Sequence, residues 1–307
     1  MMWWLVLAIL AAIAAALCTF SDNYITDTFF KGREPQAQKA FFGPAYLITA
    51  VLMLILLQIQ AVPVWVAIGL IIAGAISSLS LIPYYSALSE DDSTEVTIFE
   101  QLSPIFYLIF GRLFLGDDIS GGQLAGFVVV MIAPLIIILS SRKRSKKAKL
   151  RTAGLILIKV ATIALANTLI VKFGGDYELT TIFFYVIIGK GLIDTILAFS
   201  IKKWRVRYKN VHKKNRGVKF FSVMLADHIA WLAGDFLVYA SLALAPTVAM
   251  ASAVTKTLHP IFVFTFGIVL TLLWPAFGRE KLNKKTILTN LIATAVAVVG
   301  IVLMQVL

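Results

Sequence analysis

Cysteine and histidine are scarce in this sequence of 307 residues, and their scarcity excludes several kinds of site. The single cysteine, Cys18, cannot form a disulfide within the chain, and it cannot supply a cysteine metal cluster. The three histidines, His212, His228 and His259, lie far apart and show no metal-ligand spacing. We therefore expect no metal site and no cofactor.

Charged residues are also few, and they make up 14% of the chain against 60% for hydrophobic residues. The mean hydropathy is +0.89, and apolar runs of about 18 residues or more recur along the whole sequence. These runs do not alternate polar and apolar residues as the strands of a membrane β-barrel do. The sequence therefore predicts an all-α, polytopic membrane protein.

The apolar runs predict ten transmembrane helices, each long enough to cross about 30 Å of hydrocarbon. The first run, MMWWLVLAIL, has no lysine or arginine before it, so we expect a span there rather than a cleaved signal peptide. The predicted spans are 3–21, 41–59, 64–87, 95–115, 121–140, 152–173, 179–200, 219–244, 247–274 and 286–306.

Lysine and arginine are distributed unevenly between the predicted loops. The loops after the first, third, fifth, seventh and ninth spans, together with the adjoining Lys219, hold 23 of the 28, and the opposite side has only Arg112 and Lys172, each near a span end. Because positive residues stay on the cytoplasmic side, we expect a protein of the cytoplasmic membrane with basic loops inside and both termini outside. This placement explains the net charge of +12 without nucleic acid, and it predicts contact with membrane lipids.

The two halves of the sequence share a series of short motifs. Leu-x-Pro-Ile-Phe occurs at 102–106 and again at 258–262, and YYSALS at 84–89 has its counterpart in VYASLA at 238–243. The motifs follow the same order in both halves, which predicts one five-span repeat over 1–140, a basic loop at 141–151 and a second repeat over 152–307. Because five is odd, the second repeat must be inverted in the membrane, as in many secondary transporters.

The order of these motifs resembles that of the drug/metabolite transporter superfamily, in particular its ten-span EamA-type members. The matching residues are Ala87-Leu88, Ser103-Pro104, and the segment Leu115 to Ser120 followed by Gln123 and Gly126. The resemblance implies a transporter that works by alternating access and exports a small metabolite.

Two prolines and two charges mark the repeated motif as a candidate substrate site. Pro104 and Pro260 each free the carbonyl four residues earlier, which belongs to Glu100 in one half and to Lys256 in the other. We expect a helix kink at each proline, and we expect Glu100 and Lys256 to face a central cavity, to pair when it is empty and to bind substrate. A purely structural ion pair is the alternative.

The eighth predicted span carries Asp227, Trp231, Asp235 and Tyr239 at steps of four residues, so they share one helix face. We expect Trp231, Asp235 and Tyr239 to contact substrate. The equivalent positions Asn23 and Asn167 are further substrate candidates, although packing is the commoner role for such residues.

Several ionisable residues are candidates for a coupling proton, and others have a structural interpretation. The proton candidates are Glu100, Asp227, Asp235, His259 and His228. A histidine bonded to a backbone carbonyl is the structural alternative for the last two. Lys190 and Asp194 stand four residues apart, so we expect them to neutralise one another as a structural pair. Lys159 is expected to extend toward the basic end of its span.

The sequence thus predicts a transporter of a small polar or amphipathic metabolite, such as an amino acid, with export favoured and proton coupling as one option. A flippase for a lipid-linked headgroup is the main alternative, and a channel or receptor is a further one. We do not expect an enzyme, because HExxH, Gly-x-Ser-x-Gly and Walker motifs are all missing. The expected partners are the metabolite and membrane lipids, and a homodimer is left open.

Overall fold

The structure is a computed structural model that describes residues 3–31, 34–88, 99–100, 102–140, 146–175, 177–215, 217–273 and 284–306. Within these ranges every element of regular secondary structure is a helix. The helices are α1 (Trp3–Ile25), α2 (Lys39–Leu56), α3 (Val64–Leu79), α4 (Leu81–Leu88), α6 (Ser103–Phe110), α7 (Gly121–Ser140), α8 (Lys146–Gly174), α9 (Leu179–Ser200), α10 (Lys202–Lys214), α11 (Val218–Leu244), α12 (Val248–Leu273) and α13 (Lys284–Val306). Short helical turns cover Thr26–Phe30, Pro35–Gln38 and Gly111–Leu115.

Every predicted span contains helix, and seven helical segments are long and apolar enough to cross a membrane. These seven are Trp3–Phe30, Gln36–Leu56, Val64–Ala87, Arg151–Gly174, Leu179–Ser200, Val218–Leu244 and Val248–Leu270. Two shorter apolar helices, Ser103–Leu115 and Gly121–Ile132, accompany them. Length and hydropathy therefore identify an integral membrane protein, while the count of ten spans stays a prediction.

The two repeated prolines have different structural effects. Pro260 lies inside α12, as the sequence indicated. Pro104 instead occupies the first turn of α6, directly after a turn at Leu102. The structure thus places Pro104 at the start of a helix, whereas the sequence predicted a kink within a span. A proline fits the first turn of a helix because its missing N–H would have no partner there.

Two segments that were predicted as loops contain helix. The basic segment after the seventh predicted span forms α10, and α8 begins at Lys146, inside the basic loop predicted at 141–151. Residues 141–145 lie outside the described part of the chain, as does the end of the ninth predicted span at residue 274.

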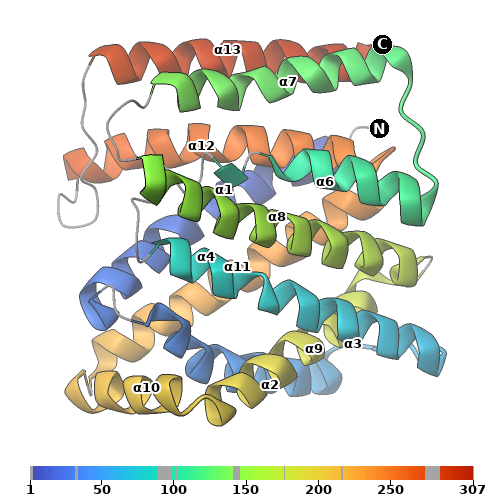
Figure 1. Cartoon of the computed structure of the whole chain (residues 1–307). Helices are drawn as coiled ribbons and strands as arrows, with labels where there is room; N and C mark the ends of the chain where they lie inside the picture. The colour runs from blue at the N-terminus through green and yellow to red at the C-terminus, as the bar shows by residue number, and fades with distance from the viewer. Residues whose placement is uncertain are drawn as a thin grey trace.

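Helices of the first half pack on helices of the second half. The two halves meet in the pairs α1 with α11, α3 with α8, α2 with α9, and α7 with α13. Figure 1 shows α7 and α13 side by side at the top of the molecule, with α2 and α10 at the bottom.

Contacts between connecting segments define one end of the helix bundle. Lys203 of α10 lies 2.8 Å from Glu34, and Arg207 donates a hydrogen bond to the carbonyl of Phe30. The side chain of Gln36 donates to Ser86 near the end of α4, at 2.8 Å. The connection that follows α1, the end of α4 and α10 therefore meet at this end.

The opposite end has its own contacts. The backbone N–H of Glu178 donates to the side chain of Gln60 at 3.3 Å, which joins the connection after α2 to the one after α8. Asp117 accepts a hydrogen bond from the backbone N–H of Val248 at 3.0 Å, so it caps the start of α12. The connections therefore fall into two groups, one at each end of the bundle.

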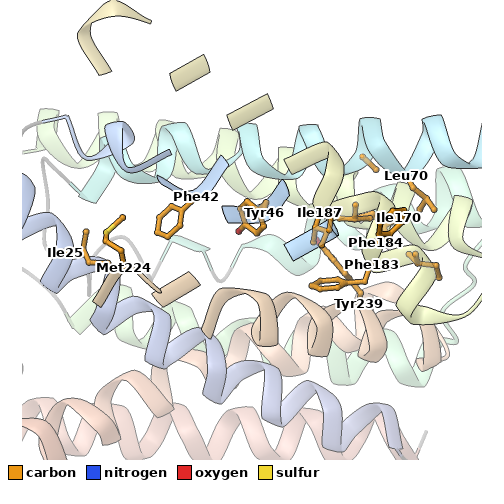
Figure 2. Packing of buried hydrophobic residues seen from close by; sticks show 14 of the residues in the cluster. Ile25, Phe42, Tyr46, Leu70, Ile170, Phe183, Phe184, Ile187, Met224 and Tyr239 are labelled. Carbon is orange, nitrogen blue, oxygen red and sulfur yellow. The ribbon is translucent and has the colours of Figure 1, made fainter. Parts of the chain in front are cut away.

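A large apolar cluster fills the space around α9. Figure 2 shows that Phe42, Tyr46, Phe183, Phe184 and Ile187 belong to one packed group, to which α3, α8 and α11 also contribute. Small residues allow α3 and α9 to approach closely. A Cβ added to Gly74 would lie 2.1 Å from the carbonyl oxygen of Val186, and one added to Gly189 would lie 2.0 Å from that of Ile71.

Candidate functional site

A cavity of about 100 Å³ lies between the two halves of the protein. Residues of α1, α8, α11 and α12 form most of its wall, and Glu100, Tyr84 and Tyr107 contribute from the first half. The polar residues that line it are Thr19, Ser80, Tyr84, Glu100, Tyr107, Lys159, Asn167, Trp231, Asp235, Ser241, Ser252, Thr255, Lys256 and His259. So polar a wall inside an apolar bundle is expected where a hydrophilic molecule or water is bound.

Glu100 is the centre of a buried group of three charges. Its Oε1 lies 2.5 Å from Nζ of Lys159, and its Oε2 lies 3.6 Å from Nζ of Lys256. The structure thus brings Glu100 and Lys256 together and adds Lys159 to them. The expectation that Lys159 extends toward the end of its span is wrong, because a buried carboxylate offers its ammonium group a closer partner.

Lys256 has the weakest contacts of these three residues and the most exposed side chain. Its side chain is 19% exposed, against 8% for Lys159, and its distance to Glu100 exceeds that of a hydrogen bond. Lys159 also lies 5.2 Å from the ring centre of Tyr84. Because one carboxylate faces two ammonium groups, the group carries one positive charge in excess, and Lys256 presents that charge to the cavity.

Ser252, Lys256 and His259 lie one helical turn apart on α12 and all line the cavity. Nε2 of His259 is 3.1 Å from the hydroxyl of Thr19, and that hydroxyl donates to the carbonyl of Ala15. Because a hydroxyl has only one hydrogen, His259 donates through Nε2 to Thr19. The histidine thereby holds α12 to α1 next to Lys256.

The predicted structural pair of Lys190 and Asp194 is wrong, because each residue is paired with another helix. Lys190 binds Asp235 of α11, and its ammonium group also lies 5.7 Å from the ring centre of Tyr239. Asp194 lies 2.6 Å from Nζ of Lys39 at the start of α2. Tertiary contacts offered both side chains closer partners than the neighbouring turn.

The pair of Lys39 and Asp194 is almost completely inaccessible to solvent, with side-chain exposures of 1% and 2%. Nζ of Lys39 also donates to the carbonyl and the hydroxyl of Ser78, at 3.0 and 2.8 Å. The hydroxyl of Ser78 in turn lies 2.5 Å from Asp194. The three residues join α2, α3 and α9 near the end of the bundle where α10 lies.

Four predicted site residues do not line the cavity. Asn23 of α1 is half-buried, and Tyr239 is buried next to Lys190. His228 packs on the ring of Phe42, at 6.0 Å between centres, and lies 3.3 Å from the hydroxyl of Thr49. Its position is that of a packing residue between α11 and α2.

Asp227 is the fourth of these residues, and it accepts a hydrogen bond from Ser21 of α1. By contrast Asn167, the equivalent of Asn23, lines the cavity and donates to the hydroxyl of Tyr107 at 2.6 Å. The two positions that the sequence predicts to be equivalent therefore have different surroundings.

The sequence interpretation missed the burial of Asp22 and Lys39, and it missed that Lys159 faces the interior of the bundle. It assigned Asp22 and Lys39 to a loop, whereas the structure buries both completely or almost so. The burial of Asp22 follows from the length of α1, which continues past the predicted span end at residue 21 and ends at Ile25.

Comparison with known proteins identifies a domain in the first half and a fold for the whole. Residues 2–139 match the model of the EamA-like transporter family. The crystal structure of another protein superimposes on this chain with a TM-score of 0.62. The two sequences are 15% identical, and the superposition covers 97% of this chain and 98% of the other. At this identity the likeness concerns the fold alone. No curated protein matches the sequence.

Proposed function

We propose that the whole chain is a secondary transporter of the drug/metabolite type, built from ten spans in two inverted repeats. The observation that carries this proposal is the polar cavity between the halves, where Glu100, Lys159 and Lys256 are buried together. A bundle interior that holds three ionised groups around a cavity is typical of a substrate pathway. The EamA-like domain at residues 2–139 supports the same interpretation.

The helix pairing supports two inverted repeats. Under the predicted alignment of the repeats, α1 corresponds to α8 and α3 corresponds to α11. The contact of α1 with α11 then has its equivalent in the contact of α8 with α3, and both contacts are present. The pairs α2 with α9 and α7 with α13 each join equivalent helices. This reciprocity is expected when a two-fold axis relates the halves.

The contacts at the two ends support an alternating path of the chain. The connections after the first and seventh predicted spans and the end of the third span meet at one end through Glu34, Gln36, Ser86 and α10. Connections after the second, fourth, sixth and eighth meet at the other through Gln60 and Asp117. The first group carries the basic residues, which favours a cytoplasmic location for it.

The charges in the cavity favour a small substrate with a carboxylate. Lys159 already neutralises Glu100, so Lys256 is available to bind an anionic group. Asp235 is neutralised by Lys190 at another part of the wall. The hydroxyl of Ser252 has no hydrogen-bond partner among the described residues, and together with the indole of Trp231 it offers further polar contacts to such a molecule. Amino acids and related carboxylates fit this chemistry and the volume of about 100 Å³.

Transport would proceed by alternate opening of the two ends around this site. The energy would come from an ion gradient or from the gradient of the substrate itself, with export favoured by the resemblance to EamA-type transporters. Opening toward the end of α10 requires separation of α2, α3 and α9, which Lys39, Ser78 and Asp194 now join. That group is therefore the proposed gate on the cytoplasmic side.

A melting screen of the purified protein in detergent tests the proposal. We expect a few small carboxylates to raise the melting temperature, since a ligand at a hundredfold excess over its dissociation constant stabilises by about 2.7 kcal/mol. The Lys256→Ala variant should lose this response. The matched control Lys213→Ala changes an exposed lysine of α10 and should keep it. Stabilisation by lipids alone would contradict a metabolite substrate and favour a lipid-linked headgroup.

A further inference from the structure

A second group of buried acids lies beside the cavity, between α1 and α11. Asp22 is 0% exposed, and both of its carboxylate oxygens lack a hydrogen-bond partner within the described part of the chain. Asp227 is 1% exposed, and Ser21 donates a hydrogen bond to its Oδ1, while its Oδ2 has no such partner among the described residues. The two carboxylates also lie within electrostatic range of one another, and we call them the acid pair.

Acidic and aromatic groups face the acid pair from most of the neighbouring elements. Glu100 acts on Asp22 as a further negative charge, and Tyr84 and Tyr85 of α4 lie within electrostatic range of it. The indole of Trp231 on α11 lies near Asp22, but its N–H has no hydrogen-bond partner among the described residues. Cys18 of α1 is one turn away on the same helix.

Positive charges near the acid pair are already engaged elsewhere. Lys159 of α8 is the cation that acts on Asp22, but its ammonium group is bonded to Glu100. On α12, Lys256 faces the same Glu100, and His259 donates to Thr19. Two ionised carboxylates at Asp22 and Asp227 would therefore leave an uncompensated negative charge inside the bundle.

Such a charge has a high cost in a membrane interior. An ionised carboxylate without partners is much less stable there than its protonated form, and two neighbouring carboxylates disfavour double ionisation. The two carboxylates differ in their hydrogen bonds, because Ser21 donates to Asp227 and no described residue donates to Asp22. This bond stabilises the carboxylate of Asp227, so the proton belongs on Asp22.

We propose that Asp22 and Asp227 form a proton-binding site, in which Asp22 holds the proton and Asp227 stays ionised. Asp22 would release its proton to water when the contact between α1 and α11 opens and would regain it when the contact closes. Trp231 borders both the cavity and a small second pocket lined by Tyr85, Lys39 and Asp194, so the site lies between the cavity and the proposed gate. Given the proposed transport function, this site would couple transport to a proton gradient.

Infrared spectroscopy of the purified protein tests proton binding without any substrate. We expect a band of a protonated carboxyl group at neutral pH that shifts in heavy water and disappears in Asp22→Asn. In Asp227→Asn the band should disappear at a lower pH than in the natural protein, because the neighbouring negative charge is removed. The control Asp118→Asn changes an acid that is 87% exposed and should leave the band unchanged. An unchanged band in Asp22→Asn would overturn the proposal.

Melting curves provide a second measurement that also reveals misfolded variants. Asparagine has nearly the shape of a protonated aspartate, so Asp22→Asn should melt at or above the temperature of the natural protein at neutral pH. A melting temperature several degrees lower would mean that Asp22 is ionised and would contradict the proposal. Stabilisation by sodium chloride but not by choline chloride, lost in Asp22→Asn, would assign the site to a sodium ion and would also overturn it. Neither measurement requires transport, so a failed melting screen for metabolites leaves this test intact.

Discussion

Glu100 lies 2.5 Å from Nζ of Lys159 although 59 positions separate the two residues in the chain. This contact fixes a carboxylate of the first half to α8 of the second. It leaves Lys256, on the same cavity wall, with a distance of 3.6 Å to the other carboxylate oxygen. The two lysines should therefore have different roles, one structural and one in binding.

Replacement of the two lysines should separate these roles. Lys159→Met leaves Glu100 with a single distant cation, and removal of one partner from a buried ion pair costs about 3–5 kcal/mol. Lys256→Met should cost clearly less, because Glu100 keeps its short contact with Lys159. Unfolding of both variants in mixed micelles measures the difference, and equal losses would show that Lys256 is also structural.

The buried group of Lys39, Ser78 and Asp194 should behave as a coupled unit. Lys39→Met and Asp194→Leu should each destabilise by about 3–5 kcal/mol, because each leaves an uncompensated charge. The double variant should recover most of this loss, so a double-mutant cycle should give a large coupling energy. The pair of the exposed Lys203 and the half-buried Glu34 at the bundle end is the control, for which a coupling of about 0–1 kcal/mol is expected. Additive losses at Lys39 and Asp194 would refute the coupling.

The close crossing of α3 and α9 should not tolerate a side chain at Gly189. An added Cβ would lie 2.0 Å from the carbonyl oxygen of Ile71, so Gly189→Ala must push the helices apart. We expect a loss of about 1–3 kcal/mol or more, as in other overpacked interiors. Gly154→Ala is the control, because no heavy atom lies within 4 Å of its added Cβ. A melting temperature of Gly189→Ala equal to that of the natural protein would show that the helices are less tightly packed.

The predicted orientation in the membrane can be measured with single cysteines. In a Cys18→Ala background, Lys209→Cys on α10 should react with an impermeant maleimide only from the cytoplasmic side. Glu178→Cys, near the opposite end, should react only from outside. Both positions are exposed, so access to the reagent is controlled by the membrane alone. Labelling of both from the same side would exclude the antiparallel path of the chain, and reversed labelling would place the basic end outside.

Much of the fold follows from local properties of the sequence. Apolar runs of sufficient length form helices in a membrane because no other open structure satisfies the backbone there. The helices α1, α8, α9 and α11 therefore lie close to their predicted ranges. The ends of the helices were less predictable. The sequence predicts Asp22 in a loop, whereas α1 continues to Ile25 and Asp22 is buried.

Partner choice among the buried charges could not be read from sequence spacing. The sequence identified Glu100, Lys256 and Asp235 as ionisable residues of the apolar interior, and all three line the cavity. It paired Lys190 with Asp194 because they stand one turn apart, whereas the structure pairs Lys190 with Asp235 and Asp194 with Lys39. A charge in a low-dielectric interior takes the partner with the best geometry, wherever that partner lies in the chain.

The amino-acid sequence by itself determined that this protein is a helical membrane protein with charges in its interior, and it determined the basic character of one set of connections. These properties depend on composition and on local order along the chain. The tertiary structure decided that Lys159 neutralises Glu100, that Lys256 is available to a ligand and that Asp22 is buried next to Asp227. Such relationships depend on which helix faces meet, and packing across the whole bundle decides which faces those are.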